Sequence, residues 1–397
     1  MAIPYWLDPA RQMAAALSED VTCEVAVIGA GLCGAAAALS LAKQGIDAVL
    51  VEAGRVAEKA TGRNAGFILQ GTAERYSRAK TIMGAEKARA VHEWTLVNHR
   101  RLREVIAEEG IDCEYRRSGS LQLAGSPEEE AELVESAALL NADGFAAELL
   151  DAAALGSTYT DAGFHMGVLL PEDGEVHPAR LVRGAVAAAV RHGVRLFEET
   201  PVTGLEANSP GDVTLQTATG TIRCQLVLIC TNARVRQLLP WYADKVDPVR
   251  GQMLATAPAP RIFEWPIYAD HGFDYWRQDA DNRIVLGGWR NLDPGTEVGF
   301  DQVLHPVIQD RMTAFLHRFT ALRDIEITHR WAGIMGFSRD SLPLVGPAPG
   351  APGALAAVGF TGHGFGFAWL AGEALVEVAL QGSHPFATLM TPRRLAR

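Results

Sequence analysis

The sequence predicts an α/β protein that combines a Rossmann-like domain with a second domain built from an antiparallel β-sheet and helices. Two regions lead to this class. Residues 23–29 (CEVAVIG) are a short β-branched segment, and the turn after them runs into the alanine-rich residues 35–44, which is the pattern of strand, turn and helix. Residues 249–289 instead read as consecutive strands with a turn at Asp281 and Asn282, as expected for an antiparallel β-meander.

The composition is that of a folded globular chain. Of its 397 residues, 48% are hydrophobic and 21% are charged, which allows a sizeable core. The net charge of −11 argues against a nucleic-acid partner, because no basic stripe overrides the negative field. No segment has the ~20 apolar residues of a membrane helix, and the N-terminus lacks the features of a signal peptide. We therefore expect a cytoplasmic protein with no membrane partner.

The five cysteines include no C-x-x-C pair and have no histidine at ligand spacing. Neither a disulfide framework nor a metal site is expected from this pattern. The cysteines are interpreted as small core residues.

Three glycines follow the first strand in the order G-x-G-x-x-G, at Gly29, Gly31 and Gly34. In such a turn the first glycine makes the bend, the second lets the backbone approach a pyrophosphate, and the third lets the helix pack against the strand. Residues 48–51 read as the next strand, and Glu52 at its end is placed to accept hydrogen bonds from an adenosine ribose. An ordinary glycine-rich turn would not require this order of strand, helix, strand and acid, so the unit predicts dinucleotide binding.

Two further segments carry a family resemblance, residues 60–67 (ATGRNAGF) and residues 359–366 (GFTGHGFG). With the βαβ unit they resemble the D-amino-acid-oxidase-like family of FAD-dependent amine oxidoreductases, which includes glycine oxidase, sarcosine oxidase and gamma-glutamylputrescine oxidase. The resemblance spans the whole chain and implies an FAD-binding domain of glutathione-reductase type interleaved with a substrate domain. The FAD-binding domain would comprise residues 1–75, 165–235 and 335–397, and the substrate domain residues 76–164 and 236–334.

The resemblance also implies where FAD is bound. Residues 60–67 would pass beneath the flavin ring, and the helix that follows His363 would point its positive N-terminus at the flavin. The implied cofactor-binding residues are Gly29, Gly31, Gly34, Glu52, Ala53, Thr61, Gly62, Arg63, Asn64, Ala65, Gly66, Phe67, Val202, Thr231, Asn232, Gly333, Met335, Gly362, His363, Gly364, Phe365 and Gly366.

Sarcosine oxidases of this family differ from the chain at two places. They carry a lysine directly after the G-H-G-F motif, where this chain has Gly366, and a cysteine near the position of Met335 that links the flavin covalently. The difference implies that FAD is bound without a covalent link. It leaves dioxygen and other electron acceptors open.

Candidates for the substrate pocket are Tyr275, Trp276 and Trp289 of the predicted meander, together with Met335 and His363. Because side chains alternate along a strand, only one of the neighbours Tyr275 and Trp276 can face a pocket. The alternative is that these aromatic residues pack in the core, and that His363 caps its loop through a local hydrogen bond.

In amino-acid-oxidising members of the family, an arginine that grips the substrate carboxylate aligns with Met335, which cannot supply a bidentate fork. We therefore expect FAD-dependent oxidation of the C–N bond of a small amine, by hydride transfer to the flavin and hydrolysis of the imine. Two alternatives stay open. One is an amino-acid oxidase or dehydrogenase that uses Arg290 or Arg339, and the other is a flavin-binding subunit or sensor without catalysis.

Overall fold

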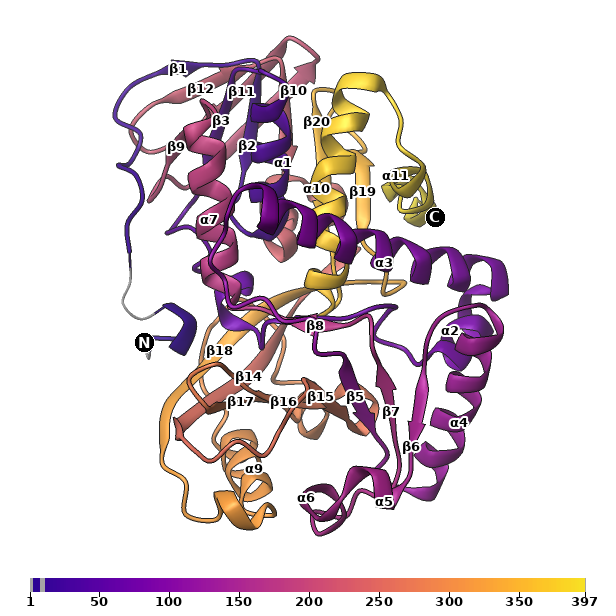
Figure 1. The fold of residues 1–397 in the computed structure, drawn as a ribbon. Helices are drawn as coiled ribbons and strands as arrows, with labels where there is room; N and C mark the ends of the chain where they lie inside the picture. Colours follow the sequence, from indigo (N-terminus) through magenta and orange to yellow (C-terminus); the bar gives the residue numbers. More distant parts are fainter. Residues whose placement is uncertain (1–2, 8–10, 397) are drawn as a thin grey trace.

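The computed structural model describes residues 3–7 and 11–396, and it shows two layered halves that share one interface (Figure 1). One half is organised around a six-stranded sheet with the order β19-β20-β13-β2-β3-β9. All neighbouring strands in it are parallel except β19, which is antiparallel to β20. The strands are β2 (Val25–Ile28), β3 (Ala48–Val51), β9 (Arg195–Phe197), β13 (Leu226–Ile229), β19 (Leu344–Pro347) and β20 (Ala354–Val358).

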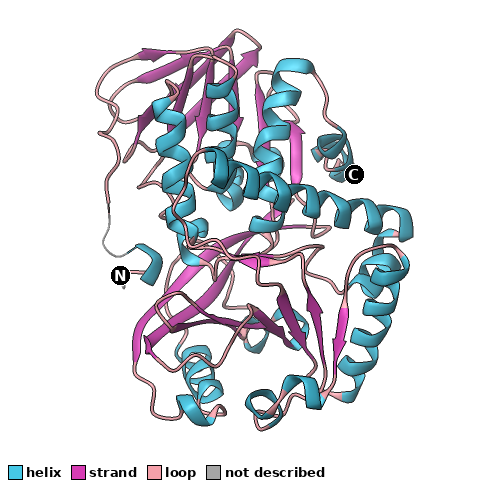
Figure 2. Ribbon diagram, in the orientation of Figure 1, coloured by secondary structure: helices cyan, strands magenta, loops and turns pink. Residues whose placement is uncertain are grey.

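Helices cover one face of this sheet (Figure 2). The helices are α1 (Leu32–Lys43), α7 (Pro178–Arg191) and α10 (Gly364–Gln381), with α3 (Ala85–Glu108) packed across α10 and α11 (Pro385–Leu389) beside β19. Small residues allow α1 and α10 to approach closely, because a Cβ added to Gly372 would lie 2.4 Å from the carbonyl oxygen of Cys33. The alanine-rich sequence of α1 therefore serves packing as well as helix propensity.

The other face carries a four-stranded sheet with the order β1-β12-β11-β10. Its strands are β1 (Val21–Thr22), β10 (Gly204–Ser209), β11 (Asp212–Gln216) and β12 (Thr221–Cys224). Residues such as Val213 and Leu215 pack against Ala26 and Val49 of the central sheet. The central strands are thus buried on both faces, as their continuous apolar sequences require.

The second half is an eight-stranded, largely antiparallel sheet with the order β18-β14-β17-β16-β15-β5-β7-β6. Its strands are β5 (Ser120–Leu123), β6 (Glu148–Leu150), β7 (Gly167–Leu170), β14 (Val246–Pro258), β15 (Ile267–Ala269), β16 (Asp274–Gln278), β17 (Arg283–Gly288) and β18 (Ile327–Ser338). One face is covered by α9 (Pro306–Leu316) with α5 (Ala152–Leu155) and α6 (Ser157–Thr160), and α2 (Tyr76–Met83) and α4 (Pro127–Ala142) lie at the β6 end. The opposite face is turned towards the first half, which it joins through β4 (Phe67–Ile68) and β8 (Gly174–Glu175).

The α/β class and the interleaved order agree with the expectation, but three elements fall across the expected boundaries. Strand β7 belongs to the eight-stranded sheet although residues 165–235 were assigned to FAD binding, and β18 continues in that sheet to Ser338. Helix α3, expected in the substrate domain, packs on α10. Chain order alone cannot tell which of two neighbouring sheets a short strand joins. Within the described residues, no helix is both long enough and apolar enough to span a membrane.

Candidate active site

A cavity of about 750 Å³ lies at the carboxyl ends of β2, β3 and β13 and extends to the inner face of the eight-stranded sheet. Ligands of open α/β sheets bind at this edge, because the turns after the strands meet there. At one end the cavity is lined by Gly31, Glu52 and Val202, and at the other end by Tyr275 and His363. The cavity therefore joins segments that are far apart in the sequence.

The three glycines of the turn after β2 have different structural roles. Gly29 has φ +101°, and a Cβ there would lie 2.8 Å from the carbonyl oxygen of Cys230. A Cβ on Gly34 would lie 1.8 Å from the carbonyl oxygen of Gly29, so only glycine permits this helix to start so close to the strand. Gly31 is different, because its nearest obstacle is Thr61 Oγ1 at 3.1 Å and it faces the cavity. Gly34 supports the turn and does not line the cavity.

Glu52 is buried, with only 8% of its surface exposed. Its carboxylate accepts hydrogen bonds from Ala30 N at 2.8 Å and Gly54 N at 2.9 Å, which fix it at the cavity wall. Burial raises the pKa of Glu52, and these two hydrogen bonds oppose the rise. A carboxylate has further lone pairs, so it can also accept hydrogen bonds from a ligand.

The segment 60–67 holds itself in place with its polar side chains. Asn64 donates to the carbonyl oxygens of Ala60 and Thr61 and accepts from Gly66 N at 2.7 Å. Arg63 is buried and donates to the carbonyl oxygen of Ala332 on β18 at 3.0 Å. Gly62 lies outside the cavity, where a Cβ would meet the carbonyl oxygen of Ala57 at 2.3 Å. These hydrogen bonds fix the loop at the cavity wall.

The C-terminal motif also places backbone at the cavity. Gly362 has φ +78°, and His363 precedes the first turn of α10. A Cβ on Gly366 would lie 2.6 Å from the carbonyl oxygen of Leu69, so no side chain fits there. Gly364 and Phe365 at the α10 N-terminus line the cavity, and the positive dipole of this helix end favours negative charge near it. Burial lowers the pKa of His363 to about 4, so its imidazole is neutral at neutral pH.

All the other implied cofactor-binding residues line the cavity, whereas two substrate candidates do not. Trp276 and Trp289 lie on the far side of the sheet, contrary to expectation, where their rings are 4.9 and 5.0 Å from that of Phe315 on α9. Tyr275 and Met335 do line the cavity. The alternation of β16 turns Tyr275 inward and Trp276 outward.

The structure adds a cluster of side chains to the inner end of the cavity. Tyr268 packs against Tyr275 with their ring centroids 5.8 Å apart. The Arg290 guanidinium lies over the rings of Phe273, at 4.5 Å, and Phe337, at 4.9 Å. Burial raises the pKa of both tyrosines, that of Tyr275 to about 12. We call this end of the cavity the aromatic chamber.

Arg290 has no ion pair or hydrogen bond to any residue in the described part of the chain, although it lines the cavity. Burial lowers its pKa. Arg339, the other arginine considered, is exposed, pairs with Asp244 at 3.2 Å and lies outside the cavity. The sequence does not favour either arginine as a carboxylate-binding residue, and only the fold distinguishes Arg290 from Arg339.

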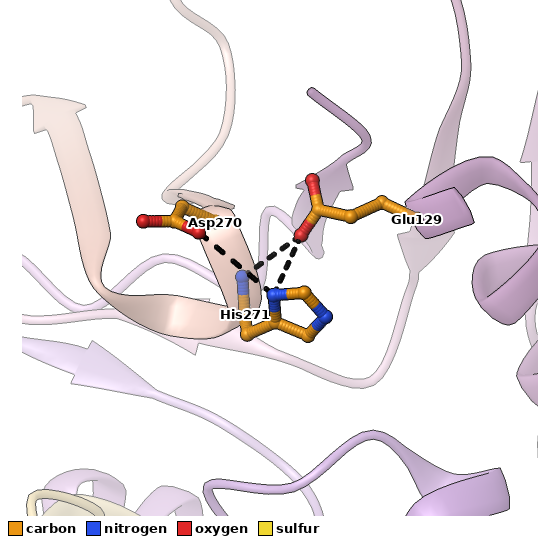
Figure 3. A group of neighbouring side chains, drawn as sticks. All are labelled: Glu129, Asp270 and His271. Atoms are coloured by element: carbon orange, nitrogen blue, oxygen red, sulfur yellow. Dashed lines mark hydrogen bonds and ion pairs between the residues drawn. The ribbon is translucent and has the colours of Figure 1, made fainter. Parts of the chain in front are cut away.

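A turn beside the aromatic chamber is fixed by an ion-pair cluster (Figure 3). Asp270, His271 and Gly272 follow one another with φ of +47°, +53° and +82°. Glu129 on α4 accepts from the backbone amide of His271 at 3.1 Å and lies 2.9 Å from its Nδ1. Glu129 also binds Arg75 at 2.9 Å and Gly125 N at 2.7 Å, so its carboxylate is fully engaged in holding the turn. We call this cluster the turn latch.

The cavity residues fit a bound dinucleotide. Gly31 opens the turn, Glu52 is fixed beside it, and the buried Thr231 Oγ1 at the wall has no partner among the described residues. A dinucleotide cradle that leads into an aromatic chamber is the arrangement expected of a dinucleotide-dependent oxidoreductase. The chain belongs to the DAO family of FAD dependent oxidoreductases, whose model matches residues 24–378.

Individual relatives agree with this assignment. The chain is 28% identical over 375 residues to gamma-glutamylputrescine oxidoreductase of Escherichia coli K12, covering 91% of this chain and 84% of that protein. It is 26% identical to glycine oxidase of Geobacillus kaustophilus, covering 86% of this chain and 88% of that protein. The crystal structure of L-proline dehydrogenase from P. horikoshii has the same fold, with a TM-score of 0.79 at 22% identity, covering 96% and 99% of the two chains.

These findings confirm the family, the FAD cofactor and the class of reaction. The chain is an FAD-dependent oxidoreductase that acts on a carbon–nitrogen bond.

Proposed function

We propose that the chain oxidises the C–N bond of an amine that also carries a carboxylate, and that Arg290 binds this carboxylate. The observation that carries the proposal is the Arg290 guanidinium in the aromatic chamber, which lies over the rings of Phe273 and Phe337 and has no ion-pair partner among the described residues. The Arg290 side chain is half-buried. A partly desolvated cation without a counter-ion among the described residues is stabilised by an anionic ligand, and a guanidinium matches a carboxylate bidentately.

This proposal adopts part of the amino-acid alternative. The apolar Met335 does line the cavity, but the cation comes from Arg290, just after β17, and not from β18. The names of similar proteins include glycine oxidase and iminodiacetate oxidase, and both of those substrates are carboxylated amines.

When bound, FAD accepts a hydride from the carbon next to the nitrogen. Arg290 would hold the carboxylate, and the protonated phenols of Tyr268 and Tyr275 can donate hydrogen bonds to the substrate. The N-terminus of α10 would stabilise negative charge that develops beside it. The apolar walls of the chamber favour the neutral amine by desolvation, and water then hydrolyses the iminium product.

The dinucleotide would be held without a covalent bond by the residues of the glycine turn, Glu52 and the segment 60–67. Close packing of Gly366 on Leu69 leaves no room for a lysine at that position. Dioxygen is one candidate electron acceptor, and a separate redox partner is the other.

The test is anaerobic bleaching of the flavin absorbance by glycine, iminodiacetate, γ-glutamylputrescine and putrescine. We expect the carboxylated amines to bleach wild type, and Arg290→Met to raise the concentration for half-bleaching about 10- to 100-fold, since a hydrogen bond to a charged group contributes ~1.5–3 kcal/mol. Arg339→Met is the matched control and should behave as wild type.

Three outcomes would change the conclusion. If putrescine bleaches best and Arg290→Met has no effect, the substrate lacks a recognised carboxylate. If no amine bleaches the flavin, a binding role without catalysis gains support. Admitting air after bleaching tests dioxygen, because an oxidase regains its colour and forms hydrogen peroxide.

A further inference from the structure

A second, smaller cavity of about 40 Å³ adjoins the main one, and we call it the side cavity. The two cavities share Tyr268, His271 and His363 in their walls. Asp173, Gln70 and Gln122 line the side cavity and not the main one. The side cavity therefore lies between wall residues of the aromatic chamber and a buried carboxyl group that the proposed function does not use.

Asp173 is completely buried. Its carboxyl oxygens accept hydrogen bonds from Gln70 N at 2.8 Å and Ser120 Oγ at 2.6 Å. No lysine or arginine of the described chain lies within ion-pair distance, and burial raises the pKa of Asp173 to about 7. The group can therefore take up and release a proton near neutral pH.

The wall of the side cavity has polar atoms suited to hold water. Gln70 Nε2 and His363 Nδ1 are both buried without a hydrogen-bond partner in the described part of the chain. A buried water needs ~10–15 Å³ and two to four polar partners. The volume of the side cavity, about 40 Å³, has room for about two or three waters by this measure.

The reaction needs a proton acceptor near the aromatic chamber, because an amine is an ammonium ion at neutral pH and must lose a proton before it can lose a hydride. Glu52 and Glu58, the only carboxylates on the described main-cavity wall, lie at its dinucleotide end. His363 is neutral there but too weak a base to keep the proton. Asp173 lines the adjoining side cavity together with His363, and it can keep the proton.

We propose that Asp173 accepts the proton that the substrate ammonium loses, and that the proton travels through His363 and water in the side cavity. The ammonium N–H bond breaks and its electron pair stays on nitrogen. The imidazole accepts this proton at one nitrogen and releases another to water, and an O–H bond forms on Asp173. The lone pair on nitrogen then forms the C=N bond of the iminium as the C–H bond of the neighbouring carbon breaks and its hydride leaves to the electron acceptor. Charge and atoms therefore balance.

Other charged or titratable groups face Asp173 and will affect its titration. Those across the side cavity are Glu74, Arg75, Tyr268, His271 and His363. Glu172 precedes it in the chain and raises its pKa. His92 on α3 lies 3.1 Å from Gln70 Oε1, and burial lowers the pKa of His92 to about 3, so it stays neutral.

The proposal depends on oxidation of an amine and not on Arg290. The experiment compares the FAD-loaded wild type with Asp173→Asn and with Ser120→Ala. Asp173→Asn keeps the volume and one acceptor oxygen but cannot take up a proton near neutral pH. Ser120→Ala keeps the acid but removes one hydrogen bond to it. Infrared difference spectra follow carboxyl protonation across neutral pH. Anaerobic stopped-flow measures the rate of bleaching by glycine, iminodiacetate or putrescine over the same range.

We expect wild type to show a carboxyl band that titrates near pH 7, together with a bleaching rate that rises over the same range. We call this rise the limb of the pH–rate profile. Asp173→Asn should lose the band and this limb, and should bleach about 100-fold more slowly, at the lower end of proton-transfer effects. Ser120→Ala should move both to higher pH, because the carboxylate loses a hydrogen bond.

A limb that persists in Asp173→Asn, or a band that does not titrate with the limb, would overturn the proposal. A purely structural role for Asp173 would slow both variants without moving the limb. Failure of the Arg290 proposal can be distinguished from failure of the Asp173 proposal. In the first case Arg290→Met has the half-bleaching concentration of wild type, and the pH profile of the bleaching rate is intact.

Discussion

Tyr275 and Trp276 are neighbours on β16 and point to opposite faces of the eight-stranded sheet. The Tyr275 ring lies in the aromatic chamber, 6.2 Å from the ring of Phe67. The Trp276 ring is completely buried on the other face, 4.9 Å from the ring of Phe315. One strand thus places Tyr275 in the cavity wall and Trp276 in the hydrophobic core beneath α9.

Substitutions at these two positions should therefore have opposite signatures. Tyr275→Phe removes a hydroxyl from the chamber, and we expect a several-fold change in the concentration of glycine or iminodiacetate needed for half-bleaching, with little change in Tm. Trp276→Phe leaves a gap beneath α9 and should lower the free energy of unfolding by about 1–3 kcal/mol. Thermal unfolding and anaerobic titration measure the two effects. A Trp276→Phe variant with altered half-bleaching but wild-type Tm would contradict this division.

The sequence predicts the local parts of this architecture and leaves the tertiary ones open. The turn with Gly29 and Gly34 is readable because each glycine has a task within one βαβ unit. The alternation rule shows that Tyr275 and Trp276 diverge, but not which of them faces inward, because that depends on α9 packing onto β14 and β17.

The same limit applies to the substrate residues. Trp289 has φ +56° just after β17 and packs on the far face, which no periodicity indicates. Arg290 follows it and reaches the chamber, whereas Arg339 is exposed, and this difference is set by tertiary contacts. The positions of Tyr268 and Phe337 in the chamber likewise depend on how two distant strands are assembled.

The turn latch gives a second prediction. The turn at Asp270 and His271 has a backbone that costs about 1–3 kcal/mol per unusual residue, and Glu129 holds it through His271. Glu129→Gln weakens this hold and should loosen Phe273, whose ring packs on Arg290. We expect half-bleaching by carboxylated amines to require several-fold more substrate.

The matched control is Glu135→Gln, at an exposed position of the same helix α4. It should leave both the half-bleaching concentration and the Tm unchanged. Equal effects of the two variants would show that the latch does not influence the chamber.

Asp274 predicts a pH-dependent stability. Its carboxyl group is buried, with Oδ1 unpaired among the described residues, and burial followed by the charge of Asp270 raises its pKa from 3.8 to about 8. The folded state therefore binds the carboxyl proton of Asp274 more tightly than the unfolded state does. The stability that it contributes is present below about pH 4 and is lost as the pH rises from about 4 to about 8.

Asp274→Asn removes this dependence. We expect its Tm to exceed that of wild type at pH 8 and to fall less between pH 4 and pH 8, in scans of the FAD-loaded proteins. Asp324→Asn, at an exposed carboxylate, is the control and should follow wild type. Parallel pH profiles for wild type and Asp274→Asn would show that the carboxyl group titrates normally.

Substitution of Gly31 should weaken FAD binding, whereas substitution of Gly34 should lower the stability of the fold. Ala at position 31 places a methyl group towards the cavity, with Thr61 Oγ1 3.1 Å away, so Gly31→Ala should fold but bind FAD at least tenfold more weakly, because the backbone can no longer approach the pyrophosphate. Gly34→Ala forces its methyl group to 1.8 Å from the carbonyl oxygen of Gly29 and should destabilise even the FAD-free protein by about 3 kcal/mol. Gly295→Ala is the control, since its nearest neighbour, Asp293 Oδ1, is 3.9 Å away. Flavin fluorescence titration and unfolding of the FAD-free proteins distinguish the variants, and wild-type FAD affinity in Gly31→Ala would place the pyrophosphate elsewhere.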